Sequence, residues 1–115
     1  MQKFLVLYSA PAAILDAWMQ KPAEERKEAE QKMMAEWKQW MSEHAKMFAD
    51  VGAGVGATKR VTLKGVADTR NDIMLYAIIE AGSHDAAAKL FIAHPHLDIP
   101  EASIEIIEIR ALPPM

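Results

Sequence analysis

The chain of 115 residues contains no cysteine, and this absence excludes several kinds of chemistry. Without a thiol there is no disulfide, no thiolate nucleophile and no thiolate metal site. A chain free of cysteine also fits a reducing compartment, and we expect the protein to be cytoplasmic.

The sequence also lacks a surplus of positive charge. Its net charge is −3, with acidic and basic residues interspersed, so no basic stripe is available to attract a phosphate backbone. We therefore expect no nucleic-acid partner, and no membrane partner either. The apolar stretch near the amino terminus, Met1 to Tyr8, is too brief for the core of a signal peptide and favours a β-strand.

Neither a cofactor loop nor a metal site is predicted. Gly52, Gly54 and Gly56 follow a helical segment, whereas a dinucleotide-binding loop needs a strand before its glycines and a helix after them. Gly52 or Gly54 is instead expected to end that helix in a left-handed conformation. His94 and His96 are a possible metal pair, but Pro95 between them should hold the backbone extended and point the two rings to opposite sides.

What organises the chain is a pair of apolar runs, Ile73–Ile79 and Ile104–Ile109. Both are too continuous for strands with one face in water, so each face of the sheet needs a cover. The helices can cover one face. The simplest cover for the other is a second copy of the same sheet, so we expect a homodimer formed through the open sheet face.

The order of elements predicts one α+β domain over residues 1–115. Strands are expected at residues 4–8, 58–63, 72–80 and 103–110, and helices at 12–19, 22–50 and 84–94. This is the order of a ferredoxin-like domain, a four-stranded antiparallel sheet with two helices on one face. The long helix should present an apolar stripe to the sheet, formed by Met33, Met34, Trp37, Trp40, Met41, His44, Met47 and Phe48.

Two histidines fall on inward stripes. His44 lies within the stripe of the long helix and His94 at the inward end of the next one, and a buried imidazole needs a hydrogen-bond partner. His44 is either a core histidine satisfied by backbone or water, or the polar group of a pocket; the second case requires that Tyr76 faces the helices. The pocket would be lined by Trp37, Trp40, Met41, Tyr76, His94 and His96.

Two segments carry a resemblance to a known family. The turn His94-Pro95-His96-Leu97 before the last strand, and the opening strand Phe4–Tyr8, are similar to the YCII-related family, including its DGPF-containing branch. The resemblance implies a dimeric α+β barrel, in which two sheets pack face to face with the helices outside. It also implies a catalytic His/Asp pair, for which His44 and Asp72 are the candidates here.

Two functions remain open. The first is a homodimeric domain that binds a small apolar or aromatic molecule without catalysis. The second is an enzyme, or a degenerate enzyme, that performs acid/base chemistry on such a molecule in a cleft between sheet and helices.

Overall fold

The computed structural model describes residues 1–114, and within this range the chain forms an α+β fold with one four-stranded antiparallel sheet and one separate hairpin. The strands are β1 (Gln2–Ser9), β2 (Phe48–Gly54), β3 (Thr58–Thr62), β4 (Gly65–Thr69), β5 (Ile73–Ala81) and β6 (Ser103–Glu108). The helices are α1 (Ala12–Gln20), α2 (Ala23–Glu43) and α3 (His84–Lys89), with short 3₁₀ turns η1 (Ala45–Met47) and η2 (Pro95–Asp98). The sheet order is β2-β5-β1-β6, and the pairs are antiparallel. The predicted α+β class is confirmed.

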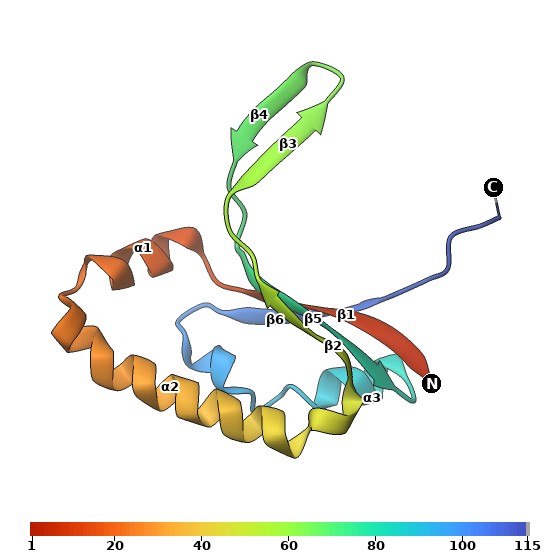
Figure 1. The fold of residues 1–115 in the computed structure, drawn as a ribbon, viewed down its shortest axis with the longest axis horizontal. Helices are drawn as coiled ribbons and strands as arrows, with labels where there is room; N and C mark the ends of the chain where they lie inside the picture. Colours follow the sequence, from red (N-terminus) through yellow and green to blue (C-terminus); the bar gives the residue numbers. More distant parts are fainter. Residues whose placement is uncertain (115) are drawn as a thin grey trace.

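The core lies between the sheet and the helices. Alternate residues of the central strand β1, Phe4, Val6 and Tyr8, are buried, and Ala77 and Ile79 of β5 are buried beside them. In Figure 1 the strands of the sheet overlap in a narrow band, with α2, α3 and η2 on one side of it. Because side chains alternate along a strand, every second residue of each apolar run points to the side of the sheet that the helices cover.

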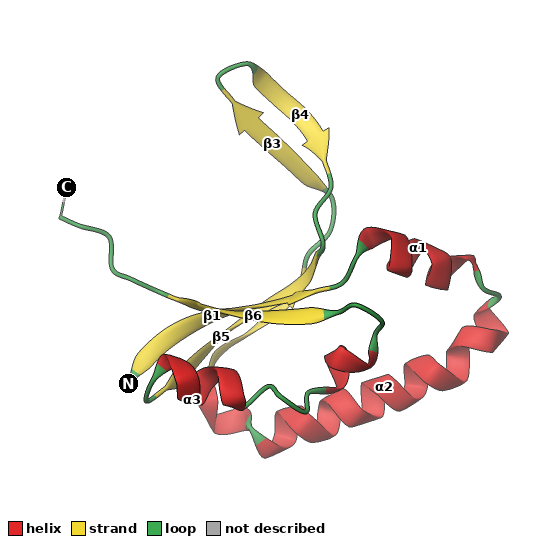
Figure 2. Cartoon of the chain, turned by 180° about the vertical axis from the view of Figure 1, so that it is seen from behind, coloured by secondary structure: helices red, strands yellow, loops and turns green. Residues whose placement is uncertain are grey.

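The opposite face of the sheet carries the remaining apolar side chains. Leu5 pairs with Ile78 and Ile107, and Leu7 pairs with Tyr76, so these residues share the side away from the core. We call Leu5, Leu7, Tyr76, Ile78 and Ile107 the open sheet face. Among the described residues no helix covers it, as Figures 1 and 2 show from two sides. In β6, Ile104 and Ile106 pack on the core, whereas Ile107 lies on the other face and is 39% exposed.

The long predicted helix is wrong at its carboxyl end. α2 stops at Glu43, and Phe48–Gly54 forms β2, the edge strand next to β5. Pairing with β5 satisfies the backbone of this segment and brings Phe48 edge-on against Trp40, so tertiary pairing overrides the helical periodicity. The predicted stripe was also wrong at Met34, which is 71% exposed.

Residues 58–69 are the second departure from the prediction. Residues 58–63 were expected to form a strand of the main sheet, but β3 and β4 pair only with each other, in a hairpin that stands apart (Figure 1). The cross-strand contacts Val61 to Val66 and Lys59 to Asp68 close this hairpin, while β2 takes the edge of the sheet.

The third predicted helix begins where expected and ends early. Ser83 is its cap, since its Oγ accepts a hydrogen bond from the Ala86 N–H at 3.1 Å, but α3 ends at Lys89 rather than at residue 94. Residues 90–93 form turns, and Phe91 and His94 are buried in the core. Within residues 1–114, no helix is long and apolar enough to cross a membrane.

Gly52 is left-handed, as predicted, but in a strand rather than at a helix end. It has φ +78° in an irregular part of the β2–β5 ladder, between Asp50 opposite Ile78 and Ala53 opposite Tyr76. A Cβ at this position would overlap the carbonyl group of Tyr76. Only glycine therefore allows the two backbones to approach here.

Replacing Gly52 with alanine should lower the free energy of unfolding by roughly 2 kcal/mol or more, because the left-handed backbone and the overlap with Tyr76 both oppose a Cβ. Urea unfolding measures the change. Gly56→Ala is the matched control, since a Cβ there meets nothing within 4 Å. Equal stability of the two variants would contradict the role of Gly52.

Candidate functional site

Five aromatic and histidine side chains meet between the sheet and α2. β1 supplies Tyr8, α2 supplies Trp37 and Trp40, and the chain after α3 supplies His94 and His96. The His94 ring lies 4.4 Å from the rings of both Trp37 and Trp40, and the Tyr8 ring lies 5.2 Å from His94 and 5.6 Å from His96. We call this group the histidine–aromatic cluster.

Hydrogen bonds to the backbone set the protonation of both imidazoles. The Nε2 of His96 lies 2.8 Å from the carbonyl oxygen of Ser9, so this nitrogen carries the proton and donates it. The backbone N–H of His96 donates to Nδ1 of His94 at 3.0 Å. The proton of a neutral His94 is therefore on Nε2, which is buried and has no hydrogen-bond partner among the described residues.

The cluster is uncharged at neutral pH. Burial is the main cause that lowers the pKa of His94 to about 4, and the neighbouring imidazoles of His96 and His44 add to the effect. Burial also lowers the pKa of His96, against the hydrogen bonds that its ring makes to backbone, and raises the pKa of the Tyr8 hydroxyl. The cluster thus provides neutral polar groups in an apolar setting.

The prediction that Pro95 points the two imidazoles to opposite sides is wrong. Both rings contact Tyr8 and Trp37. The reason is local: Pro95 is the first residue of the turn η2, and His94 caps this turn through its side chain, so the segment does not alternate like a strand. Among residues 1–114, no three histidine or acidic side chains gather where they could hold a metal ion.

His44 is held by backbone. It follows the last residue of α2, its Nδ1 lies 2.8 Å from the carbonyl oxygen of Trp40, and its ring stacks on the Trp40 ring at 4.2 Å. Tyr76 belongs to the open sheet face, so the arrangement that a pocket around His44 requires is not formed. Met41 is partly buried and packs against the core.

The predicted pocket residues are therefore divided between the two sides of the sheet. Trp37, Trp40, His94 and His96 are together in the cluster, where their rings pack against one another, and Tyr76 is on the far side of the sheet.

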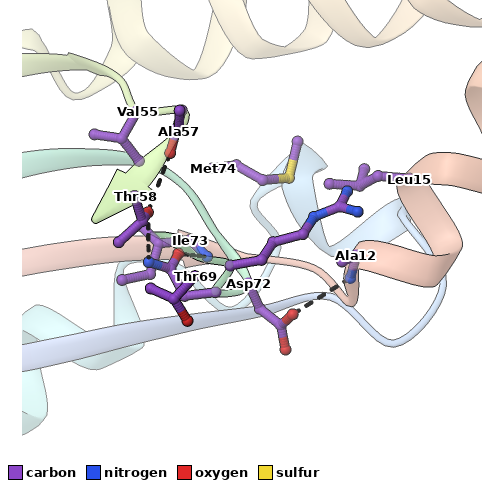
Figure 3. A pocket seen from close by; sticks show the side chains of 12 residues that line it. Ala12, Leu15, Val55, Ala57, Thr58, Thr69, Asp72, Ile73 and Met74 are labelled. Atoms are coloured by element: carbon purple, nitrogen blue, oxygen red, sulfur yellow. Dashed lines mark hydrogen bonds between the residues drawn. The ribbon is translucent and has the colours of Figure 1, made fainter. Parts of the chain in front are cut away.

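A cleft of about 490 Å³ lies elsewhere, at the root of the hairpin. α1, the start of β5 and both ends of the hairpin surround it (Figure 3). Its walls are formed by Ala12, Leu15, Val55, Gly56, Ala57, Thr58, Thr69, Arg70, Asn71, Asp72, Ile73 and Met74. We call it the root cleft.

The polar groups of the root cleft tie its walls together. The Nδ2 of Asn71 donates to Oγ1 of Thr58 at 3.1 Å, and its Oδ1 accepts the N–H of Ile73 at 2.9 Å. The Oδ1 of Asp72 accepts the N–H of Ala12 at 3.3 Å, at the start of α1. Arg70 makes a two-pronged pair with Asp16 at 2.8 and 2.9 Å, which lowers the pKa of that exposed carboxyl.

No family model matches the chain, and no curated protein matches it closely enough to count as a relative.

His44 and Asp72, the predicted catalytic pair, are not brought together. Phe48, just after His44, pairs with Ile79 near the end of β5, whereas Asp72 precedes Ile73 at its start. The length of the strand therefore separates the two side chains. Asp72 lies in the root cleft and His44 beside the cluster.

Sequence reasoning missed Tyr8 and the cleft residues Thr58, Arg70 and Asn71. A hydroxyl in the apolar run of β1 is a signal for Tyr8, because such a group is seldom placed in a core without reason. The cleft residues carry no comparable signal, since polar residues beside a turn are ordinary.

The depressed pKa of His94 predicts a loss of stability in mild acid. The unfolded chain binds a proton on His94 more tightly than the folded chain does. The stability contributed by the neutral, buried imidazole is therefore complete above pH 6.5 and is lost as the pH falls from 6.5 towards 4. Its size is on the order of 3 kcal/mol. His94→Asn, whose Oδ1 can replace Nδ1 as acceptor, should flatten this pH dependence in urea unfolding.

His84→Gln serves as the control, because it alters a histidine outside the cluster, whose Nε2 lies 2.7 Å from the carbonyl oxygen of Ile106. Its stability should fall with pH as in the native chain. A His94→Asn variant with an unchanged slope would show that another group titrates.

Proposed function

We propose that this protein is a homodimeric small-molecule-binding domain. Each chain would be a ferredoxin-like unit, and two units would pair through their open sheet faces as a dimeric α+β barrel. The strand order β2-β5-β1-β6, with α2 and α3 on one side, supports the first part. The architecture is the one that resemblance to the YCII-related family implies.

The open sheet face is the observation that carries the proposal. Its apolar side chains are already partly shielded by their neighbours, so covering each one contributes on the order of 1 kcal/mol. Summed over both protomers, this is on the order of 10 kcal/mol. Association costs about 4–15 kcal/mol in lost translational and rotational freedom, so the sheet contact offsets a cost of this order and leaves little surplus.

The root cleft is the binding site that the geometry favours. Its volume of about 490 Å³ lies within the usual range for small-ligand pockets, roughly 300–1,000 Å³. Leu15, Val55 and Met74 give it apolar walls, and Asp72 and Thr58 add polar groups at defined points. The combination suits a small, largely apolar molecule with one or two hydrogen-bonding groups.

One observation favours the second candidate, an enzyme with acid/base chemistry. His94 is 1% exposed, and its Nε2–H has no hydrogen-bond partner among the described residues. A buried donor of this kind is costly to leave unpaired. A ligand oxygen that entered the cluster would satisfy it. The aromatic rings of the cluster occupy that space, so we place this candidate second.

The native chain should be a dimer at micromolar concentration, and Ile107→Glu should be a folded monomer. Ile107 is 39% exposed in the single chain, so the charge is tolerated there, whereas an unpaired charge inside the interface costs several kcal/mol. Sedimentation equilibrium measures the mass, and circular dichroism verifies folding.

Met34→Glu is the matched control for this test. It places the same charge at an apolar residue that is 71% exposed on α2, away from the open sheet face, and should leave the dimer intact. A native chain that is monomeric would contradict the proposal.

Small aromatic and phenolic compounds should include at least one that raises the melting temperature of the native chain. Leu15→Trp, which places a larger side chain in the root cleft, should abolish the shift, and His44→Ala should retain it. The reverse pattern, with the shift lost in His44→Ala or His94→Asn and kept in Leu15→Trp, would favour a site at the cluster instead.

A further inference from the structure

The hairpin formed by β3 and β4 stands on the open side of the sheet. Figures 1 and 2 show it rising away from the band of strands, opposite to α2 and α3, and the chain after β6 leaves on the same side. We call residues 58–69 the hairpin arm. The radius of gyration is 16.4 Å, above the roughly 13 Å of a compact domain of this length, as expected for a chain with such projections.

The arm exposes apolar side chains that its own chain does not cover. Val61 and Val66 are opposite each other on the two strands and are 75% and 67% exposed, and Leu63 at the tip is fully exposed. A two-stranded hairpin by itself is at best marginally stable in water. Its strands are only five residues long, and an exposed ion pair of Lys59 with Asp68 adds little.

The position of the arm indicates what covers it. Any molecule seated on the open sheet face lies beside the arm, because both are on the same side of the sheet. The proposed occupant of that face is a second copy of the chain. In a two-fold dimer each arm then extends along the other protomer, so the contact occurs twice.

Area gives a second reason for the contact. The shortest strand of the sheet, β6, has six residues. From ordinary strand rise and spacing, four strands of that length cover roughly 20 by 19 Å, or roughly 400 Å² in projection. A standard stable interface buries roughly 800 Å² on each partner. The sheet alone is therefore small for a stable dimer, and the arm lies where it can extend the contact.

We propose that the hairpin arm is a clamp between subunits, in which Val61, Leu63 and Val66 of one protomer pack on the second protomer. This inference rests on the proposed homodimer and adds the part of the chain that strengthens it. The clamp also bears on the root cleft, because Thr58 and Thr69 at the base of the arm form part of its wall. Binding of the partner would hold that wall in place.

The first test uses the absence of cysteine from the native chain, since an introduced thiol is then the only one. Leu63→Cys is labelled with a benzophenone maleimide and irradiated at micromolar concentration. A covalent dimer is expected on a denaturing gel, with the crosslinked peptide identified by mass spectrometry. Glu24→Cys, at the exposed start of α2, is the control and should give no covalent dimer.

The second test measures the dimer constant. A variant with Val61→Ser, Leu63→Ser and Val66→Ser should weaken the dimer about 10- to 100-fold in sedimentation equilibrium, because the arm loses its apolar surface while the core keeps all of its residues. Lys64→Ser, at the same tip, should leave the dimer constant unchanged.

The outcomes separate the two proposals. If the native chain is a monomer, the proposed homodimer itself fails. If the native chain is a dimer that Ile107→Glu dissociates, but the triple serine variant keeps the native dimer constant and the Leu63 label gives no covalent dimer, then only the clamp is overturned.

Discussion

A four-stranded sheet has two faces, and the helices of this chain cover one of them. β1 lies between β5 and β6, so its alternate side chains divide the molecule into a filled side and an open side. On the filled side, Phe4, Val6 and Tyr8 meet α2 and α3 in a packed core. On the open side, no helix among the described residues covers the apolar side chains. The need to cover that second face underlies both the proposed dimer and the proposed clamp.

The histidine–aromatic cluster shows how polar groups are accommodated on the filled side. His96 donates to the carbonyl of Ser9, and its own N–H fixes the tautomer of His94, so backbone rather than acidic side chains orients both rings. Burial keeps the imidazoles neutral by lowering their pKa values. These features are those of a core that specifies how the segment after α3 docks on the sheet. Among the described residues, Nε2 of His94 is a buried side-chain nitrogen without a hydrogen-bond partner.

The proposed assembly and the proposed ligand site share structural elements. The base of the hairpin arm forms a wall of the root cleft, and Asn71 ties that base to the start of β5. A partner that holds the arm would also order the cleft. The proposed binding residues Thr58, Asn71 and Asp72 lie in or beside loops, where positions are set by the elements that the loops connect.

The sequence by itself determined the α+β class, the apolar strands and their two faces, because side-chain alternation is a local property that Ile104, Ile106 and Ile107 display directly. Only the tertiary structure decided that Phe48–Gly54 is a strand and that residues 58–69 leave the sheet. Local periodicity favoured a helix through Phe48, and the competing backbone pairing with β5 comes from residues far along the chain. The pairing register of β1 with β5 likewise decided on which side of the sheet Tyr76 lies. It thereby also decided that His44 contacts the backbone of Trp40 and not Tyr76.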